Sequence, residues 1–192
     1  MTHIQTDPIA ERTRLLRELA QSRLLSSAAQ AIAETLKNGG KVLAFGNGGS
    51  ATQSSHFAAE LVNRFARQRP ALAAISLACD PACLTSIAND SEYAAVFSRQ
   101  LEALGRRGDV ALALTTGGKS PNILAALETA KRLGLATIVC SGRFTGALAA
   151  RRPDILLAVD SDATPIIQEM HLFLLHAIAE QVEYAISGGS DA

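Results

Sequence analysis

Four side chains, in two stretches far apart along the chain, have types and spacing suited to holding a divalent metal ion. His56 and Glu60 are four residues apart, and Gln168 and His176 are eight apart. On a helix, residues at either spacing lie on nearly the same face. Two imidazoles, a carboxylate and an amide oxygen can bind Zn²⁺ or a similar ion and leave room for substrate oxygens. A histidine on an amphipathic helix is more often structural, so the spacing alone leaves both interpretations open.

A glycine-rich turn stands directly before the first pair. Residues 41–45 form an apolar run and residues 52–65 contain no Gly or Pro, so residues 46–51 (Gly-Asn-Gly-Gly-Ser-Ala) are predicted to turn from strand to helix. Their free backbone N–H groups would face an anion or a polyhydroxylated ligand. The turn matches the dinucleotide fingerprint by letter, but the acid expected about 20 residues on is missing until Asp80. That gap disfavours a nucleotide cofactor.

A second loop offers hydroxyl groups and a cation. Residues 115–120 read Thr-Thr-Gly-Gly-Lys-Ser and follow the apolar run 110–114. Three hydroxyls, a lysine and the backbone N–H groups of one turn suit a phosphate monoester. The alternative is a loop that caps a helix and binds nothing. The last three residues resemble the end of a P-loop, but the earlier glycine of that motif would fall at Ala113, so the match fails.

Alternating strands and helices must position these loops. Apolar runs predict strands at 41–46, 72–77, 109–114, 135–140 and 155–159, and helices follow at about 50–65, 81–88, 92–104, 120–133, 145–150 and 164–186. Such alternation is typical of a parallel sheet covered by helices on both faces. The predicted fold is α/β, a three-layer sandwich around a five-stranded parallel sheet. Ligands of such sheets bind beyond the carboxyl ends of the strands, where both loops fall.

A helical segment precedes the first strand. Asp7 and Pro8 suit a helix start, Gly39 and Gly40 suit its end, and apolar residues recur every three to four positions between them. Residues 7–38 therefore form one long helix or two in succession. The pattern does not decide whether this segment packs on another subunit or on its own domain. At the other end, residues 187–192 are predicted to be a flexible tail.

Composition favours one class of protein and excludes others. At 192 residues, 48% of them hydrophobic, the chain is long enough for one domain with a substantial core. Eighteen basic residues balance eighteen acidic ones, which gives no electrostatic footprint for nucleic acid or an anionic membrane. No apolar run reaches the roughly 18 residues that span a bilayer, and the N-terminus lacks a signal pattern. Three cysteines, odd in number, favour reduced thiols in a cytoplasmic protein.

Short motifs along nearly the whole chain point to one family. They are Gly-Asn-Gly-Gly-Ser at 46–50, His-Phe-Ala-Ala-Glu-Leu at 56–61, Arg-Pro at 69–70, Ala-Asn-Asp at 88–90, Phe-Ser-Arg-Gln at 97–100, Gly-Asp-Val at 108–110, Ser-Pro-Asn at 120–122 and Ile-Gln-Glu-Met-His at 167–171. Together they make the chain resemble the sugar isomerase (SIS) domain family, and within it the phosphoheptose isomerases. The resemblance implies a flavodoxin-like sheet order. It also implies a homotetramer whose N-terminal segment (residues 1–38) serves oligomerisation and whose active sites lie between subunits.

The resemblance also implies roles for individual residues. The implied metal ligands are His56, Glu60, Gln168 and His176, and the implied acid–base residues are Glu60 and His176. The implied substrate-binding residues, besides Glu60 and Gln168, are Asn47, Gly48, Gly49, Asn89, Asp90, Thr115, Thr116, Gly117 and Ser120. The implied cofactor is one Zn²⁺, or a similar divalent metal ion, in each site.

Three positions depart from the pattern of the family. Its second loop usually reads Ser/Thr-Thr-Ser-Gly-Asn-Ser, whereas this chain has Gly117 in place of the second Ser and Lys119 in place of Asn. One phosphate-binding hydroxyl is lost, and a positive charge is gained. The family usually has Arg where this chain has Ile166. These changes bear on the substrate more than on the class of reaction, because the four metal-site residues are retained.

The activity implied by the resemblance is aldose–ketose isomerisation. Sedoheptulose 7-phosphate would be converted through a metal-assisted cis-enediol to D-glycero-D-manno-heptose 7-phosphate, the first step of ADP- or GDP-heptose biosynthesis. Some SIS proteins have instead lost the catalytic pair and are binding modules, including one that assembles the bacterial replication initiator on DNA. A binding protein of that type, with or without isomerase activity, or a sugar-phosphate sensor is therefore the alternative. Retention of Glu60 and His176 favours the enzyme.

Overall fold

The computed structural model of the protein describes residues 7–188. Two helices come first, α1 (Pro8–Ala20) and α2 (Arg23–Lys37), so residues 7–38 contain two helices in succession. The Asp7 carboxylate caps α1 by accepting a hydrogen bond from Ile9 N at 2.9 Å. Of the predicted tail, residues 189–192 lie outside the described residues, and Ser187 directly follows the last helix.

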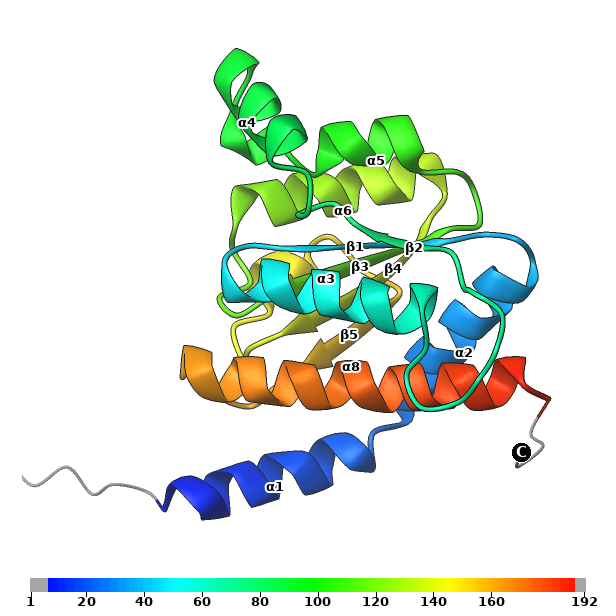
Figure 1. Cartoon of the computed structure of the whole chain (residues 1–192). Helices are drawn as coiled ribbons and strands as arrows, with labels where there is room; N and C mark the ends of the chain where they lie inside the picture. The colour runs from blue at the N-terminus through cyan, green and yellow to red at the C-terminus, as the bar shows by residue number, and fades with distance from the viewer. Residues whose placement is uncertain (1–6, 189–192) are drawn as a thin grey trace, which may run out of the picture.

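Strands and helices alternate through the rest of the chain (Figure 1). The strands are β1 (Val42–Gly46), β2 (Ala74–Ser76), β3 (Val110–Thr115), β4 (Ala136–Ser141) and β5 (Ile155–Ala158). The helices are α3 (Gly49–Val62), α4 (Pro81–Asp90), the short 3₁₀ helix η1 (Tyr93–Ala95), α5 (Ser98–Leu104), α6 (Pro121–Leu133), α7 (Gly146–Ala149) and α8 (Thr164–Ile186). The predicted order of strands and helices is confirmed.

The five strands form one parallel sheet in the order β2-β1-β3-β4-β5. This confirms the predicted five-stranded parallel sheet. The chain winds outward in both directions from the neighbouring strands β1 and β3. In doubly wound sheets the crevice beyond the carboxyl ends of two such strands is the usual ligand site. The two predicted ligand loops, 46–51 and 115–120, lie on either side of that crevice.

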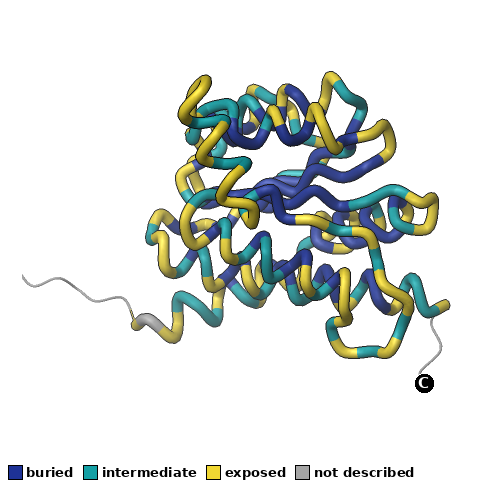
Figure 2. The backbone as a smooth tube through the Cα atoms, turned by 45° about the horizontal axis from the view of Figure 1, so that its top comes forward, coloured by how far each residue is buried: buried dark blue, intermediate teal, exposed yellow. Residues whose placement is uncertain are grey.

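Alternating side chains of the strands enter two separate cores. In β1, Val42 and Ala44 join the core under α1, α2, α3 and α8, while Leu43 and Phe45 join the core under α5 and α6. This is the three-layer arrangement predicted from the unbroken apolar strands. Figure 2 shows the strands buried through most of their length and the exposed positions gathered on the outer helices and the loops.

Some predicted boundaries were wrong. The helix predicted at 50–65 ends at Val62, because the next residues turn away and bond to another helix through their backbone N–H groups. The helix predicted at 92–104 is divided into η1 and α5, and the buried residues Val96 and Phe97 join the two pieces. Through residues 7–188, no helix combines the length and apolar character that crossing a membrane would require.

Candidate active site

Three of the predicted side chains meet between α3 and α8. His56 Nε2 lies 2.9 Å from His176 Nε2 and 3.3 Å from Glu60 Oε1. One possible ligand atom from each of the three residues lies within 4.8 Å of the other two. The side chain of His56 is 41% exposed and that of Glu60 is 20% exposed, so a ligand can reach the group from solvent.

Packing of the two helices fixes this meeting point. His56 and Glu60 are one turn apart on α3, while the buried residues Phe57 and Leu61 of the same helix enter the core below. The Phe65 ring, just past the end of α3, lies 5.4 Å from the ring of His176, centroid to centroid. The polar groups are therefore carried on a helix whose other face is anchored in the core.

The chemistry of these side chains fits a divalent metal ion. Ligand atoms bound to zinc at about 2.0–2.1 Å in tetrahedral geometry stand about 3.3 Å apart, close to the two separations measured around His56 Nε2. Imidazole nitrogen and carboxylate oxygen are ordinary zinc ligands. His56, Glu60 and His176 can therefore supply three of the four predicted ligands.

The glycine-rich turn brings Gln168 close to the start of α3. Gly48, at the N-cap of α3, has a φ of +56°, a conformation that favours glycine. A Cβ atom on Gly49 would lie only 2.4 Å from Gln168 Nε2, so glycine lets the amide approach the backbone. The backbone oxygen of Gln168 also accepts a hydrogen bond from Gln53 Nε2 at 2.6 Å. Gln168 thus lies beside the predicted sugar loop, and its role as a metal ligand stays a prediction.

Asn47 is held across the crevice between β1 and β3. Its Nδ2 donates to Asn122 Oδ1 at 2.9 Å, and Asn122 Nδ2 donates back to Asn47 Oδ1 at 2.8 Å. The Tyr93 hydroxyl donates to the same Asn47 oxygen at 3.1 Å. This amide pair links the loop after β1 to the first turn of α6. It gives the predicted sugar-contacting residue a fixed orientation.

The hydroxyl-rich loop lines a pocket of about 730 Å³. Its lining residues are Thr116, Gly117, Gly118, Lys119, Arg143, Phe144, Thr145, Gly146, Ala147, Asp162 and Thr164. Thr115 is buried, and its Oγ1 accepts a hydrogen bond from Gly118 N at 3.2 Å. Ser120 stands at the N-cap of α6 without a side-chain capping bond. Thr116 and Gly117 therefore face the pocket, whereas the Thr115 hydroxyl is engaged inside the loop.

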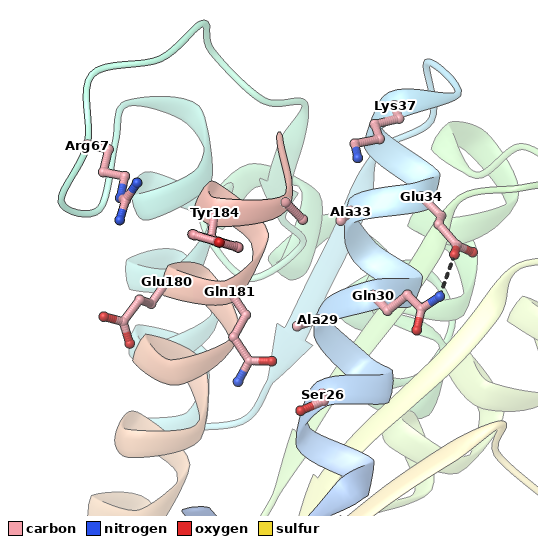
Figure 3. Close-up of a pocket in the computed structure, with 11 residues that line it drawn as sticks. Ser26, Ala29, Gln30, Ala33, Glu34, Lys37, Arg67, Glu180, Gln181 and Tyr184 are labelled. Atoms are coloured by element: carbon pink, nitrogen blue, oxygen red, sulfur yellow. Dashed lines mark hydrogen bonds between the residues drawn. The ribbon is translucent and has the colours of Figure 1, made fainter. Parts of the chain in front are cut away.

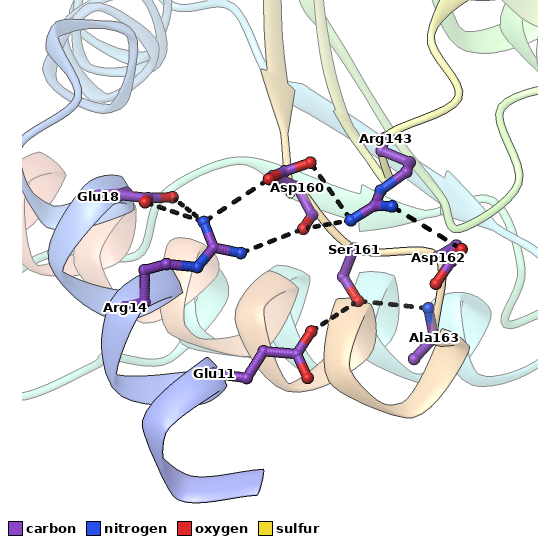
Figure 4. A network of polar contacts seen from close by, with 8 residues as sticks. All are labelled: Glu11, Arg14, Glu18, Arg143, Asp160, Ser161, Asp162 and Ala163. Atoms are coloured by element: carbon purple, nitrogen blue, oxygen red, sulfur yellow. Dashed lines mark hydrogen bonds and ion pairs between the residues drawn. The ribbon is translucent and has the colours of Figure 1, made fainter. Parts of the chain in front are cut away.

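A polar network holds one wall of this pocket (Figure 4). Arg143 Nη2 donates to the backbone oxygen of Asp160 at 3.1 Å and lies 3.4 Å from the Asp160 carboxylate. Arg14 of α1 reaches the same backbone oxygen at 3.5 Å. Ser161 Oγ donates to the Glu11 carboxylate, also on α1, at 3.5 Å. Arg143 is thus a second positive charge at the pocket beside Lys119, held in place by the loop that leads into α8.

Asn89 and Asp90 lie elsewhere in the described chain. Both are exposed at the end of α4, where Asn89 Nδ2 donates to Asp90 Oδ1 at 2.8 Å. Asp90 lines a separate pocket of about 420 Å³, which also contains Ser86 and Arg99. In Figure 1 α4 projects outward from the body of the molecule. Their contact with substrate stays a prediction.

His171 is on α8 but belongs to a different environment. It is fully buried, and neither ring nitrogen has a hydrogen-bond partner among the described residues. Burial lowers its pKa to about 4. His171 is therefore a neutral core residue and lies outside the group formed by His56, Glu60 and His176.

Fold and site together define an α/β protein with a doubly wound sheet, a His/Glu group between α3 and α8 that could hold a metal ion, and a hydroxyl-rich loop after β3. The family model of the SIS domain matches residues 9–142 of this chain. The phosphoheptose isomerase of Desulfovibrio desulfuricans is 48% identical over 164 residues, which are 85% of this chain and 78% of the relative.

Solved structures agree with this similarity. The phosphoheptose isomerase of Neisseria gonorrhoeae superposes with a TM-score of 0.84 at 38% identity, over 91% of this chain and 94% of the other. The structure from Francisella tularensis gives a TM-score of 0.85 at 36% identity, over 91% and 93%. The chain therefore belongs to the SIS domain family and, within it, to the phosphoheptose isomerases.

Several residues at the site were missed by sequence reasoning. Tyr93, Asn122 and Arg143 each contact a predicted loop or line the pocket. Asn122 had a signal, because it ends the Ser-Pro-Asn motif directly after the hydroxyl loop. Tyr93 and Arg143 had none, because their places depend on how distant segments pack.

Proposed function

We propose that this protein interconverts sedoheptulose 7-phosphate and D-glycero-D-manno-heptose 7-phosphate, the first step of ADP- or GDP-heptose biosynthesis. The observation that carries the proposal is the meeting of His56, Glu60 and His176 between α3 and α8, with one possible ligand atom of each within 4.8 Å of the others. Relatives with 36–48% identity that are named phosphoheptose isomerases support the choice of substrate. A phosphorylated sugar would have its reacting end near this cluster and its phosphate at the loop 115–120.

The chemistry requires a proton to move between two adjacent carbons. Glu60 takes the proton from the carbon beside the carbonyl, which gives a cis-enediol, and His176 is the acid–base partner at the other carbon. Glu60 Oε1 faces His56, so Oε2 is the oxygen assigned to the proton. A carboxylate and an imidazole suit reversible transfer because each can accept and return a proton.

The site would hold one Zn²⁺ or a similar divalent ion through His56, Glu60, His176 and Gln168. Such an ion, when bound, polarises the substrate carbonyl and stabilises negative charge on the adjacent oxygens. The protein's contribution is to hold two ligands on α3 and two on α8. The short distances around His56 Nε2 support this assignment.

The phosphate would bind in the pocket beside the loop 115–120. Thr116 and the backbone of Gly117 face that pocket. Lys119 adds a positive charge, and Arg143 adds one that it shares with the carboxylates of Asp160 and Asp162. The hydroxyl lost at Gly117 is thereby offset by cations that attract a dianionic phosphate. Ser120 and Thr115 complete the proposed loop, and Asn47, Gly48 and Gly49 contact the sugar.

The protein is further proposed to form a homotetramer in the cytoplasm, with sites completed between subunits. A groove of about 550 Å³ between α2 and α8 supports an interface on that face (Figure 3). Tyr184, on the α8 side of this groove, is 52% exposed. Outside the groove, Ile9 of α1 is 68% exposed. Asn89 and Asp90, which lie away from the pocket, would reach a site only through such an assembly. Light scattering on the purified protein tests the mass, and a monomer would remove this part of the proposal.

The direct test is an isomerase assay with purified protein and sedoheptulose 7-phosphate. We expect the heptose 7-phosphate aldose to form, conversion to fall after treatment with a chelator, and added Zn²⁺ to restore it. A folded, metal-loaded protein that binds the sugar phosphate without converting it would contradict the proposal and favour a sensor. Capture of replication-initiator protein without conversion would favour the binding module.

A further inference from the structure

A buried ion pair lies beyond the proposed catalytic group, between α8 and the loop that follows α3. Arg69 Nε donates to Glu183 Oε1 at 3.0 Å, and both side chains are only 1% exposed. Burial acts to raise the pKa of Glu183, but hydrogen bonds from backbone N–H groups and the charge of Arg69 outweigh it, so the pKa is lowered. The pair is therefore charged. We call it the Arg69–Glu183 clasp.

The arginine of the clasp is bound to the residue proposed as catalytic base. Arg69 Nη2 donates to the backbone oxygen of Glu60 at 2.6 Å, and Nη1 donates to that of Leu61 at 2.8 Å. These carbonyls belong to the last turn of α3, where the helix has no further N–H groups to offer them. The guanidinium supplies the hydrogen bonds that a further helical turn would have made, and it thereby fixes the backbone of Glu60.

The glutamate of the clasp holds the segment that contacts the other catalytic residue. Its carboxylate accepts hydrogen bonds from the backbone N–H groups of Phe65 at 2.7 Å, Ala66 at 2.9 Å and Arg67 at 3.0 Å. The Phe65 ring in turn lies against the ring of His176. Glu183 follows His176 by seven residues, two turns of α8, so both face α3.

We propose that the Arg69–Glu183 clasp is a positioning device that sets the distance between the acid–base residues Glu60 and His176. This inference rests on the proposed function, because it concerns how α3 and α8 are held for that reaction. Without the clasp, the backbone at Glu60 and the ring of Phe65 lose their fixed places together. Misplacement of reacting groups by about 1 Å can lower a rate by about 100-fold.

A second buried carboxylate provides a matched control. Asp109 is 2% exposed and accepts hydrogen bonds from Lys41 N at 3.0 Å, Lys41 Nζ at 2.6 Å and Arg106 N at 2.8 Å. It resembles Glu183 in burial and in its mixture of backbone and cationic partners. It lies directly before β3, and none of these partners is a proposed site residue. Asp109→Asn therefore removes a comparable charge without touching the clasp.

The experiment compares Glu183→Gln, Arg69→Lys and Asp109→Asn with the unchanged protein. Arg69→Lys retains the charge facing Glu183, but one ammonium group cannot serve Glu183, Glu60 and Leu61 together. We expect kcat to fall about 10- to 100-fold in both clasp variants, with KM within about threefold because the phosphate loop is unaltered. The Asp109→Asn protein should keep kcat within about twofold. All assays are run well below the melting temperature of each variant.

A second readout does not depend on turnover. Because the proposed ligands come from both helices, the clasp variants should bind Zn²⁺ at least about tenfold more weakly in competition with a chelating dye, and Asp109→Asn should not. Folded clasp variants with normal kcat and normal Zn²⁺ affinity would overturn the inference, as would an equal loss of both in Asp109→Asn. If Glu183→Gln does not fold, Arg69→Lys decides. If the unchanged protein shows no isomerase activity, the proposed function fails, and the Zn²⁺ titration still decides on the clasp.

Discussion

Polar groups in two regions of the molecule are arranged in opposite ways. At the amino edge, Asp109 is surrounded by donors from Lys41 and Arg106, and Asp154 accepts from both the backbone N and the Oγ1 of Thr137 at 2.7 Å. Between α3 and α8, His56 and its two partners face one another and remain open to solvent. We call this group, together with the loops 46–51 and 115–120 after β1 and β3, the open edge. One edge is closed by its own hydrogen bonds, and the other is available to a ligand.

This difference separates stability from chemistry within one fold. A buried carboxylate with several internal donors contributes to folding, and its removal leaves those donors without a partner. Polar groups at the open edge contribute little to folding, since water or a ligand can replace their partners. Substitutions at the two edges should therefore have effects that barely overlap.

The largest expected effect is at the open edge. His176→Asn should lower kcat by about 100- to 10,000-fold, because it removes one of the two acid–base groups. The melting temperature should change little, since the ring is partly exposed and is replaced by another polar group. Steady-state kinetics and circular dichroism check the two statements. A variant with near-normal kcat would contradict the acid–base role of His176 and the assignment of the chemistry to the open edge.

At the closed edge the effect should be on stability instead. Asp109→Asn should lower the free energy of unfolding by about 2–3 kcal/mol, less than a fully buried pair would lose, because the Lys41 side chain is 30% exposed. Urea unfolding measures this change. If the stability were unchanged while turnover fell, the division between the two edges would be wrong.

Lowering the pH should reduce stability through His171, a buried group that takes no part in the proposed chemistry. The folded-state pKa of His171 is lowered to about 4, so as pH falls from about 6.5 the unfolded chain takes up the proton first. Stability should therefore decrease between about pH 6.5 and 4, by on the order of 3 kcal/mol. His171→Leu should flatten that decrease in unfolding curves. Glu183 acts in a lower window, since its stabilisation is present above its ordinary pKa and is lost as pH falls through its lowered value.

A smaller effect should distinguish anchoring from catalysis within the open edge. Lys119→Ala should raise KM for the sugar phosphate about tenfold and change kcat little, because phosphate is bound equally in the ground and transition states. Lys131→Ala is the matched control, an exposed lysine in the last turn of α6, the helix that begins after the loop 115–120. A drop in kcat without a change in KM for Lys119→Ala would show that the loop does more than anchor the substrate.

Sequence patterns predicted the sheet and most of the open edge for clear physical reasons. Apolar runs such as residues 110–114 must be buried on both faces, and helical spacing fixed His56 against Glu60. The proximity of His56 to His176 could not follow from spacing, because it depends on packing across 120 positions of sequence. The resemblance to a family supplied it.

Other features depended on tertiary contacts that leave no pattern. The early end of α3 at Val62 follows from Glu183 binding the next backbone N–H groups, and nothing near Val62 signals that partner. The role of Arg143 in the pocket likewise depends on Asp160. Local sequence predicts helices and strands well, whereas loop geometry is decided by distant residues.

The most direct test of the central claim is solvent hydrogen exchange at the reacting carbon, followed by NMR in deuterated water. We expect the metal-loaded protein to incorporate deuterium from solvent during conversion of sedoheptulose 7-phosphate. A folded Glu60→Gln variant should do so at least about 100-fold more slowly, because it lacks the base that removes the proton. Exchange by Glu60→Gln at the rate of the unchanged protein would contradict the account.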